Sequence, residues 1–297
     1  MRGVELILRQ LENCLTAKLN NCGIMYRVFS RAKTQESILK KLAVKGEKYR
    51  KEGTKMQDLL GFRVTLYFSD DVQLFRAILK SEKYFHSESA NIYDTETFCP
   101  QVLNIICHIP DELIDDFHEI KLAYSGSELI DDTYEVQIRT VLSEGWHEVE
   151  HDLRYKCAED WDGHDDYKRL LNGVFATLET SEWSMLSIFE NLAHAHYKSM
   201  NWDAMLRNKM RIRLVPNKGK ALSLEIKQLL TEDRQLAKII YRTSRKKVLS
   251  WIMQSSFSMP LQYDTVMFLI NRIEVKDERL IALENPILSE EFVSLGL

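Results

Sequence analysis

Residues 134–156 read YEVQIRTVLSEGWHEVEHDLRYK. Polar and apolar residues alternate in the first part of this stretch, and three polar positions on one side are Glu135, Gln137 and Arg139. This alternation predicts a β-strand with one buried face and one polar face. Farther on, apolar residues recur at three- and four-residue steps, which predicts a helix whose polar side carries His151. A strand that leads into a helix in this way is typical of α/β active sites, where functional groups gather near strand ends.

The composition is that of an ordinary soluble protein. The chain has 297 residues, of which 45% are hydrophobic and 28% are charged, so it can form one large domain or two modest ones. The sequence contains neither an apolar run long enough for a membrane span nor the pattern of a signal peptide. The five cysteines are odd in number and lack a CxxC pair, which indicates reduced thiols. We therefore expect a cytoplasmic protein with no membrane partner.

A second motif lies upstream. Residues 24–42 read IMYRVFSRAKTQESILKKL, which predicts a strand followed by a helix. Arg31 and Lys33 end the strand, while Ser37 and Lys41 lie early in the helix. Cations and a hydroxyl in this arrangement suit a cradle for polyphosphate, because such groups make strong hydrogen bonds to phosphate oxygens. The alternative is that these residues are scattered surface groups.

A third motif stands between the other two. Residues 56–68 read MQDLLGFRVTLYF and predict another strand, because apolar residues alternate with Arg63 and its neighbours. Asp58 lies just before this strand. By itself, an isolated Asp before a strand is usually a cap or turn residue.

Together the three motifs resemble those of the RelA/SpoT-type nucleotide pyrophosphokinases, the synthetases of guanosine tetra- and pentaphosphate alarmones. The matching patterns are R-x-K-x-x-x-S-I-x-x-K at residues 31–41, D-x-x-G-x-R at residues 58–63, and EVQIRT followed by W…EHDLRYK at residues 135–156. The resemblance covers roughly residues 20 to 160. It implies transfer of the β,γ-diphosphate of ATP to the 3′-hydroxyl of GDP or GTP, with Mg²⁺ as the cofactor.

The resemblance also implies roles for individual residues. Asp58 and Glu135 are the expected catalytic residues and magnesium ligands, and Glu135 is suited to accept the proton of the attacking hydroxyl. Five residues are expected to hold the phosphates of ATP: Arg31, Lys33, Ser37, Lys41 and Arg63. Three residues are expected to contact the acceptor: Gln137, Arg139 and His151. Such a site works mainly through positioning and electrostatics.

The acceptor motif of the family is missing. The family has G-Y-x-S-x-H before a strand, whereas residues 99–104 read CPQVLN here. Stacking on an aromatic ring is a sizeable part of base recognition, and Tyr93 or Phe98 is the candidate substitute for the missing tyrosine. A second acceptor therefore stays open, namely the 3′ end of tRNA, as in toxin-like relatives. The basic segment 40–55 favours tRNA, while the net charge of −4 opposes it.

Two further alternatives concern the chemistry itself. His147, Glu148 and His151 spell H-E-x-x-H on a helix, the signature of zinc metalloproteases, although nothing in the sequence marks a third ligand. A catalytically dead regulator is the other alternative. We discount it because the donor-side and metal-side positions are all retained, and a dead enzyme has no physical reason to keep them.

The fold expected from these elements is α/β, or α+β, with a mixed β-sheet of about five strands flanked by helices, as in nucleotidyltransferases. We predict a small synthetase-like domain at residues 1–200 and a mainly helical C-terminal extension at residues 201–297, with one short strand, MRIRLV, at residues 210–215. Only about twenty residues precede the first motif, so no metal-binding HD-type hydrolase domain is expected and the enzyme should make its product without degrading it. A homo-oligomer is left open.

Overall fold

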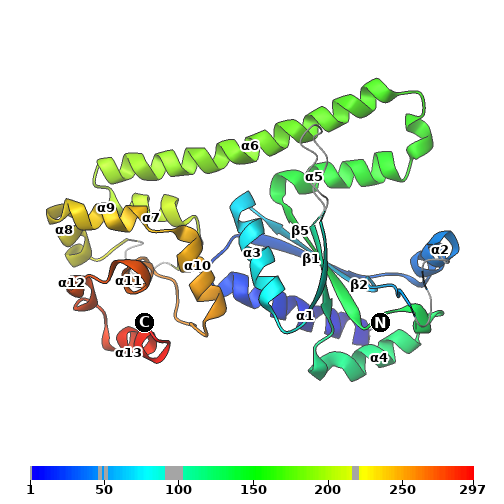
Figure 1. Cartoon of the computed structure of the whole chain (residues 1–297), viewed down its shortest axis with the longest axis horizontal. Coiled ribbons are helices and arrows are strands. Elements are labelled where there is room, and N and C mark those ends of the chain that lie inside the picture. The colour runs from blue at the N-terminus through cyan, green and yellow to red at the C-terminus, as the bar shows by residue number, and fades with distance from the viewer. Residues whose placement is uncertain (1, 46–48, 50–52, 91–102, 216–220) are drawn as a thin grey trace. The chain divides into compact units, whose positions relative to one another are not determined.

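The chain folds into two compact units. The structure is a computed structural model (Figure 1) that describes residues 2–45, 49, 53–90, 103–215 and 221–297. Residues 1–16 and 26–180 form the first unit, and residues 17–25 and 181–297 form the second. The predicted domain boundary at residue 200 stays a prediction.

The first unit is built on a mixed five-stranded sheet, as predicted. Its strands are β1 (Tyr26–Ala32), β2 (Leu60–Leu66), β3 (Phe85–Ala90), β4 (Leu103–His108) and β5 (Thr133–Thr140). Their order across the sheet is β1-β2-β5-β4-β3, in which β2 and β5 are parallel and the other neighbours are antiparallel. The pair of β2 and β5 therefore brings two of the sequence motifs side by side.

One face of the sheet is apolar and carries the core of the first unit. Four of its side chains, each at most 2% exposed, are Phe62, Val64, Val136 and Ile138. The first part of helix α1 (Arg2–Asn21) covers this face, since Glu12 accepts a hydrogen bond from Ser30 of β1 at 2.8 Å. Helix α3 (Ser69–Ser81) packs against β2 and β5. Burial of apolar surface of this kind is the dominant favourable contribution to folding.

The opposite face is polar and leads into helix α5 (Val141–Glu150). The Thr140 hydroxyl accepts a hydrogen bond from the backbone N–H of Ser143 at 3.0 Å, and the Thr140 N–H donates to the Ser143 hydroxyl at 3.1 Å. This capping box fixes the direction in which α5 leaves β5. The helix then continues through one π-helical turn, η4 (His151–Tyr155).

The remaining elements are α2 (Gln35–Lys45), η2 (Asp111–Leu113), α4 (Ile114–Leu122), η3 (Ser127–Leu129), η5 (Ala158–Trp161) and α6 (Asp165–Lys198), which ends in the second unit.

The second unit is mainly helical. Its helices are α7 (Trp202–Met210), α8 (Leu224–Glu232), α9 (Arg234–Arg242), α10 (Arg245–Gln254), α11 (Tyr263–Ile270), η6 (Asn271–Val275), α12 (Glu278–Ile281) and α13 (Pro286–Ser294). The predicted short strand at residues 210–215 is wrong. Met210 ends α7, and Arg211 has a left-handed backbone with φ 47°, so the chain turns there instead of extending. In the described part of the chain, each helix is too short or too polar to span a membrane.

Candidate active site

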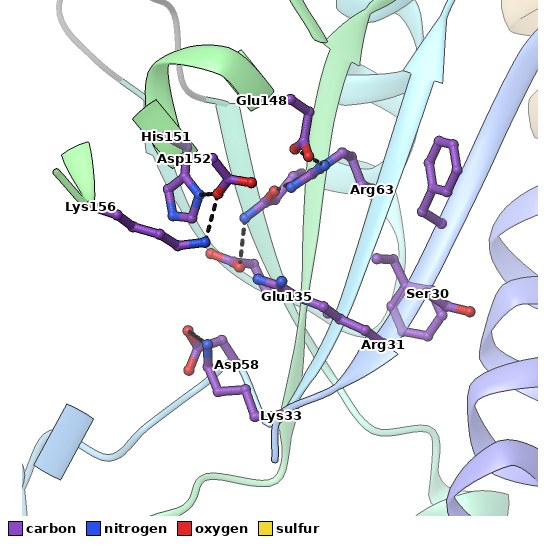
Figure 2. Close-up of a pocket in the computed structure, with 14 residues that line it drawn as sticks. Ser30, Arg31, Lys33, Asp58, Arg63, Glu135, Glu148, His151, Asp152 and Lys156 are labelled. Atoms are coloured by element: carbon purple, nitrogen blue, oxygen red, sulfur yellow. Dashed lines mark hydrogen bonds and ion pairs between the residues drawn. The ribbon is translucent and has the colours of Figure 1, made fainter. Parts of the chain in front are cut away.

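The polar side of the sheet holds a cavity of about 280 Å³ (Figure 2). Its lining consists of Phe29, Ser30, Arg31, Lys33, Asp58, Gly61, Phe62, Arg63, Glu135, Gln137, Glu148, His151, Asp152 and Lys156. These residues come from β1, from β2 and the segment before it, and from β5 with the helix that follows. The cavity thus brings together seven residues that the sequence predicts as site residues: Arg31, Lys33, Asp58, Arg63, Glu135, Gln137 and His151.

The register of the strands explains how these side chains meet. Arg31 of β1 pairs with Gly61 of β2, and Gly61 pairs with Glu135 of β5. Because directly paired residues lie on the same face, the guanidinium and the carboxylate flank the glycine. A Cβ atom at Gly61 would meet no described atom within 4 Å, so the glycine leaves open space between them. In the next row along the strands, Arg63 pairs with Gln137.

Asp58 is held by two lysines. Lys41 Nζ donates to its two carboxylate oxygens at 2.8 and 2.7 Å, and Lys33 Nζ lies 3.3 Å from Oδ2. Burial alone would raise the pKa of Asp58, but the hydrogen bonds from Lys41 and the charge of Lys33 outweigh burial and lower the pKa below its ordinary value. Asp58 is therefore an ionised carboxylate in the cavity wall, next to two cations.

Glu135 faces the same cavity in a different environment. Asn104 Nδ2 donates to its Oε1 at 3.0 Å, and Gln137 Nε2 donates to its Oε2 at 3.1 Å. Burial raises the pKa of Glu135 above its ordinary value, and the negative charge of Asp58 raises it further. The two carboxylates thus line one cavity, Asp58 from the segment before β2 and Glu135 from β5.

Arg63 and Arg139 belong to one network with the carboxylates of α5. Arg63 Nη1 donates to Glu144 at 2.7 Å and also to Glu148, and its Nε donates to Gln137 at 3.4 Å. Arg139 Nη1 donates to Glu144 at 3.0 Å. Burial lowers the pKa of Arg139, although Glu144 acts in the opposite direction. Arg139 lies outside the cavity lining, so its predicted contact with the acceptor stays a prediction.

Two candidate ATP-binding residues also lie outside this lining. Ser37 is exposed on α2, and its backbone N–H donates to the Thr34 hydroxyl at 3.2 Å, an arrangement that caps the helix. Lys41 reaches the cavity through its ion pair with Asp58. The predicted roles of Ser37 and Lys41 in ATP binding stay predictions.

Three charged lining residues were not predicted as part of the site: Glu148, Asp152 and Lys156. They recur at four-residue steps, so one side of α5 and η4 faces the cavity (Figure 2). Asp152 accepts a hydrogen bond from Lys156 Nζ at 2.6 Å and pairs with His151 Nδ1 at 3.0 Å. Lys156 and then His151 lower the pKa of Asp152. The four-residue spacing after the strand is the signal that identifies them.

The geometry does not support the zinc alternative. His147 is 5% exposed, and its ring packs against Trp146 and Phe175 at centroid distances of 5.5 and 6.2 Å. His151 instead lines the cavity and pairs with Asp152. Among the described residues, no group of three His, Cys, Asp or Glu side chains is placed to hold a metal ion.

The structure describes the segment of the missing acceptor motif only from Leu103, the first residue of β4. Tyr93, Phe98 and residues 99–102 lie outside the described residues, so the expectation that one of the two rings replaces the missing tyrosine stays a prediction. Asn104 stands where the family motif has its histidine, and its amide contacts Glu135 at 3.0 Å. Asn104 was not predicted as a site residue, because its contact depends on how β4 pairs with β5.

The three motifs lie in a segment that known proteins share. Residues 30–160 match the family model described as the region found in RelA and SpoT proteins. Among solved structures, the chain is similar to the small alarmone synthetase 1 from Bacillus subtilis, with 23% identity, 63% of this chain and 90% of that chain covered, and a TM-score of 0.44. A GTP pyrophosphokinase family protein from Streptococcus pneumoniae has 21% identity, with 63% and 88% covered and a TM-score of 0.44. A comparison with curated proteins finds no match.

Proposed function

We propose that the protein transfers the β,γ-diphosphate of ATP to the 3′-hydroxyl of a guanine nucleotide, GDP or GTP, because residues 30–160 match the model of a region found in RelA and SpoT proteins. The observation that carries the proposal is the meeting of Asp58 and Glu135 in one cavity with Arg31, Lys33 and Arg63. Pyrophosphoryl transfer needs this combination, because cations hold the triphosphate while carboxylates serve the metal ion and the nucleophile.

The residues present suit Mg²⁺ as the cofactor. Asp58 and Glu135 offer hard oxygen ligands, and magnesium is usually bound by one or two carboxylates together with substrate phosphates. Burial and the charge of Asp58 raise the pKa of Glu135, and a cation between the two carboxylates would relieve their repulsion. When bound, Mg²⁺ would neutralise negative charge on the phosphates of ATP.

The chain's own side chains account for the transfer itself. Glu135 takes the proton of the acceptor hydroxyl while the hydroxyl oxygen forms a bond to the β-phosphorus of ATP. The bond from that phosphorus to the oxygen bridging the α-phosphate breaks, and AMP leaves with the electron pair. Arg31 and Lys33 offset the charge of the phosphates from the end of β1. The products are AMP and an acceptor that carries a 3′-diphosphate.

The 3′ end of tRNA is the second candidate acceptor. It is favoured by the sequence CPQVLN at residues 99–104, which lacks the tyrosine on which a guanine would stack. The basic segment 40–55 would attract a phosphate backbone. This alternative keeps the donor side, Asp58 and Glu135 unchanged and alters only the molecule that supplies the hydroxyl.

An acceptor panel tests the proposal. The full chain is incubated with labelled ATP and Mg²⁺, and GDP, GTP, ADP and tRNA are added one at a time. We expect label on GDP or GTP together with one AMP for each product. Label on tRNA alone would move the function to the second candidate. If no acceptor gains label and no AMP forms, the enzymatic proposal is wrong.

A further inference from the structure

Two glutamates of α5 hold Arg63 in different ways. Glu144 accepts a hydrogen bond from Arg63 at 2.7 Å and another from Arg139 at 3.0 Å, and its side chain is only 14% exposed. Glu148 also accepts from Arg63, but its side chain is 52% exposed and lines the cavity (Figure 2). Arg63 is thus anchored by a largely buried carboxylate and covered on the cavity side by an exposed one.

We propose that Glu148 occupies the place of a phosphate group on Arg63 and is displaced when a nucleoside triphosphate binds. The inference rests on the proposed function, because it takes Arg63 to be a triphosphate-binding residue. Glu144 keeps Arg63 in position during the exchange. Glu148 sets the affinity for the incoming polyphosphate, because the two anions compete for one guanidinium.

The chemistry of the guanidinium supports such an exchange. Its planar fork of N–H donors suits carboxylate and phosphate alike. Arg63 uses Nη1 for both glutamates and Nε for Gln137, so a phosphate that takes Nη1 must replace one carboxylate. An exposed ion pair contributes little to stability. Glu148 is therefore the carboxylate that yields, while Glu144 is retained by its second bond to Arg139.

Binding of α,β-methylene-ATP in the presence of Mg²⁺, measured by isothermal titration calorimetry on the full chain, tests the exchange without turnover. Glu148→Gln removes the competing charge and keeps the length of the side chain, so we expect affinity for the analogue to rise about two- to fivefold, in line with the weakness of exposed ion pairs. Glu144→Gln should lower the affinity, because Arg63 then loses its anchor. The exchange therefore predicts that these two substitutions on one helix change the affinity for the analogue in opposite directions.

Two controls separate the exchange from a general effect of charge. Glu150 lies on the same helix and pairs with Arg154 at 3.1 Å outside the cavity lining, so Glu150→Gln removes the same charge and should leave the affinity unchanged. The second control is a double-mutant cycle. In an Arg63→Gln background, Glu148→Gln should give no gain, because the arginine that it would unmask is gone.

Several results would overturn the inference: an equal gain with Glu150→Gln, a gain that persists without Arg63, or no gain with either Glu148→Gln or Glu148→Ala. The proposed function is judged separately. If the wild type binds the analogue but forms no AMP from ATP with any acceptor, the transfer fails while the exchange stands. If neither the wild type nor Glu148→Gln binds the analogue, both fail.

Discussion

Asp58 and Glu135 face the same cavity, but their surroundings move their pKa values in opposite directions. Hydrogen bonds from Lys41 and the charge of Lys33 overcome the burial of Asp58 and lower its pKa, whereas burial and the charge of Asp58 raise the pKa of Glu135. Carboxylates whose pKa values are pushed apart are suited to different roles in catalysis. Asp58 suits a permanent negative charge, and Glu135 suits the uptake of a proton.

This difference predicts the effect of Glu135→Gln on turnover. Glutamine keeps the shape of the side chain but cannot take the proton of the acceptor, so AMP formation should fall by about a hundredfold or more. Affinity for ATP should stay nearly unchanged, because the cations of the cavity are retained. AMP release and analogue binding measure the two effects, with Glu150→Gln as a fully active control. Full activity of Glu135→Gln would show that this carboxylate does not serve as the base.

The same substitution should affect stability with a defined dependence on pH. The folded-state pKa of Glu135 is raised, so the proton binds the folded state more tightly than the unfolded state. The resulting stabilisation is present below the ordinary glutamate pKa of 4.5 and is lost as the pH rises through the folded-state pKa. Glu135→Gln should therefore raise the free energy of unfolding at pH 7.5 and leave it nearly unchanged at pH 3.5. Urea unfolding in EDTA measures both values, and an equal change at the two pH values would contradict the prediction.

Gly61 offers a steric test of the cavity. A Cβ atom at this position would meet no described atom within 4 Å, so we expect Gly61→Leu to fold and its side chain to fill the space between Arg31 and Glu135. We expect affinity for the ATP analogue to fall about tenfold or more, which corresponds to about 1.4 kcal/mol of binding free energy. Gly173→Leu is the control, because its Cβ on α6 also meets open space, but outside the cavity lining. Equal binding by both variants would show that the nucleotide lies elsewhere.

At the scale of elements, alternation identified the strands that carry the site. β2 and β5 each show buried residues at every second position over most of their length, because one face of the sheet packs on helices. β3 was not predicted, because FHSESA at Phe85–Ala90 lacks that alternation and is half-exposed. This strand forms through its pairing with β4, and the register of the pairing shifts between Phe85 and Ser87. The apparent alternation in residues 210–215 was misleading, because Arg211 adopts a left-handed turn.

The site residues divide in the same way, into those that a local sequence pattern predicts and those that depend on how distant segments pair. Four site residues could be predicted because each lies in or next to a local strand motif, and strand neighbours share a face. They are Arg31, Lys33, Asp58 and Glu135. The contact of Asn104 with Glu135 could not be predicted, because no local pattern reports which strands pair. The four-residue spacing of Glu148, Asp152 and Lys156 is visible in the sequence, but the continuation of α5 into a π-helical turn is not. Such turns are frequent at functional sites and have no simple sequence signature.

The junction between β5 and α5 makes a prediction about stability. Thr140 is 6% exposed, and its hydroxyl caps α5. Thr140→Val keeps the shape and removes the cap, so the free energy of unfolding should fall by about 1 kcal/mol. Thr177→Val on the exposed side of α6 should change it by about 0.5 kcal/mol or less. Urea unfolding compares the two variants, and equal losses would mean that the cap contributes nothing.

At the scale of the whole molecule, the two units share the chain in an interleaved way. Residues 17–25 belong to the second unit although segments of the first unit lie on both sides of them. Within the second unit, the N–H of Arg213 donates to the carbonyl of Gly23 at 2.7 Å. The sequence motifs placed a boundary near residue 200, and they could not reveal this pairing because it joins positions far apart in the chain.

Gly23 tests whether this pairing stabilises the second unit. Its φ is 67°, and a Cβ atom there would lie 2.7 Å from the carbonyl oxygen of Arg213, which cannot move aside as a flexible side chain would. Gly23→Ala should therefore cost more than the roughly 1 kcal/mol expected for a left-handed backbone alone. Gly296→Ala is the matched control, since its φ is 81° but its Cβ meets no described atom within 4 Å.

Hydrogen exchange followed by mass spectrometry locates the effect of Gly23→Ala. If residues 17–25 are part of the second unit, exchange should accelerate most in peptides from that segment and from residues 181–297, and less in peptides from residues 26–180. Gly296→Ala should change exchange only near the C-terminus. Acceleration confined to residues 26–180 would place the segment with the first unit instead. Residues 17–25 would then stabilise the unit that holds the cavity, and the second unit would depend on residues 181–297 alone.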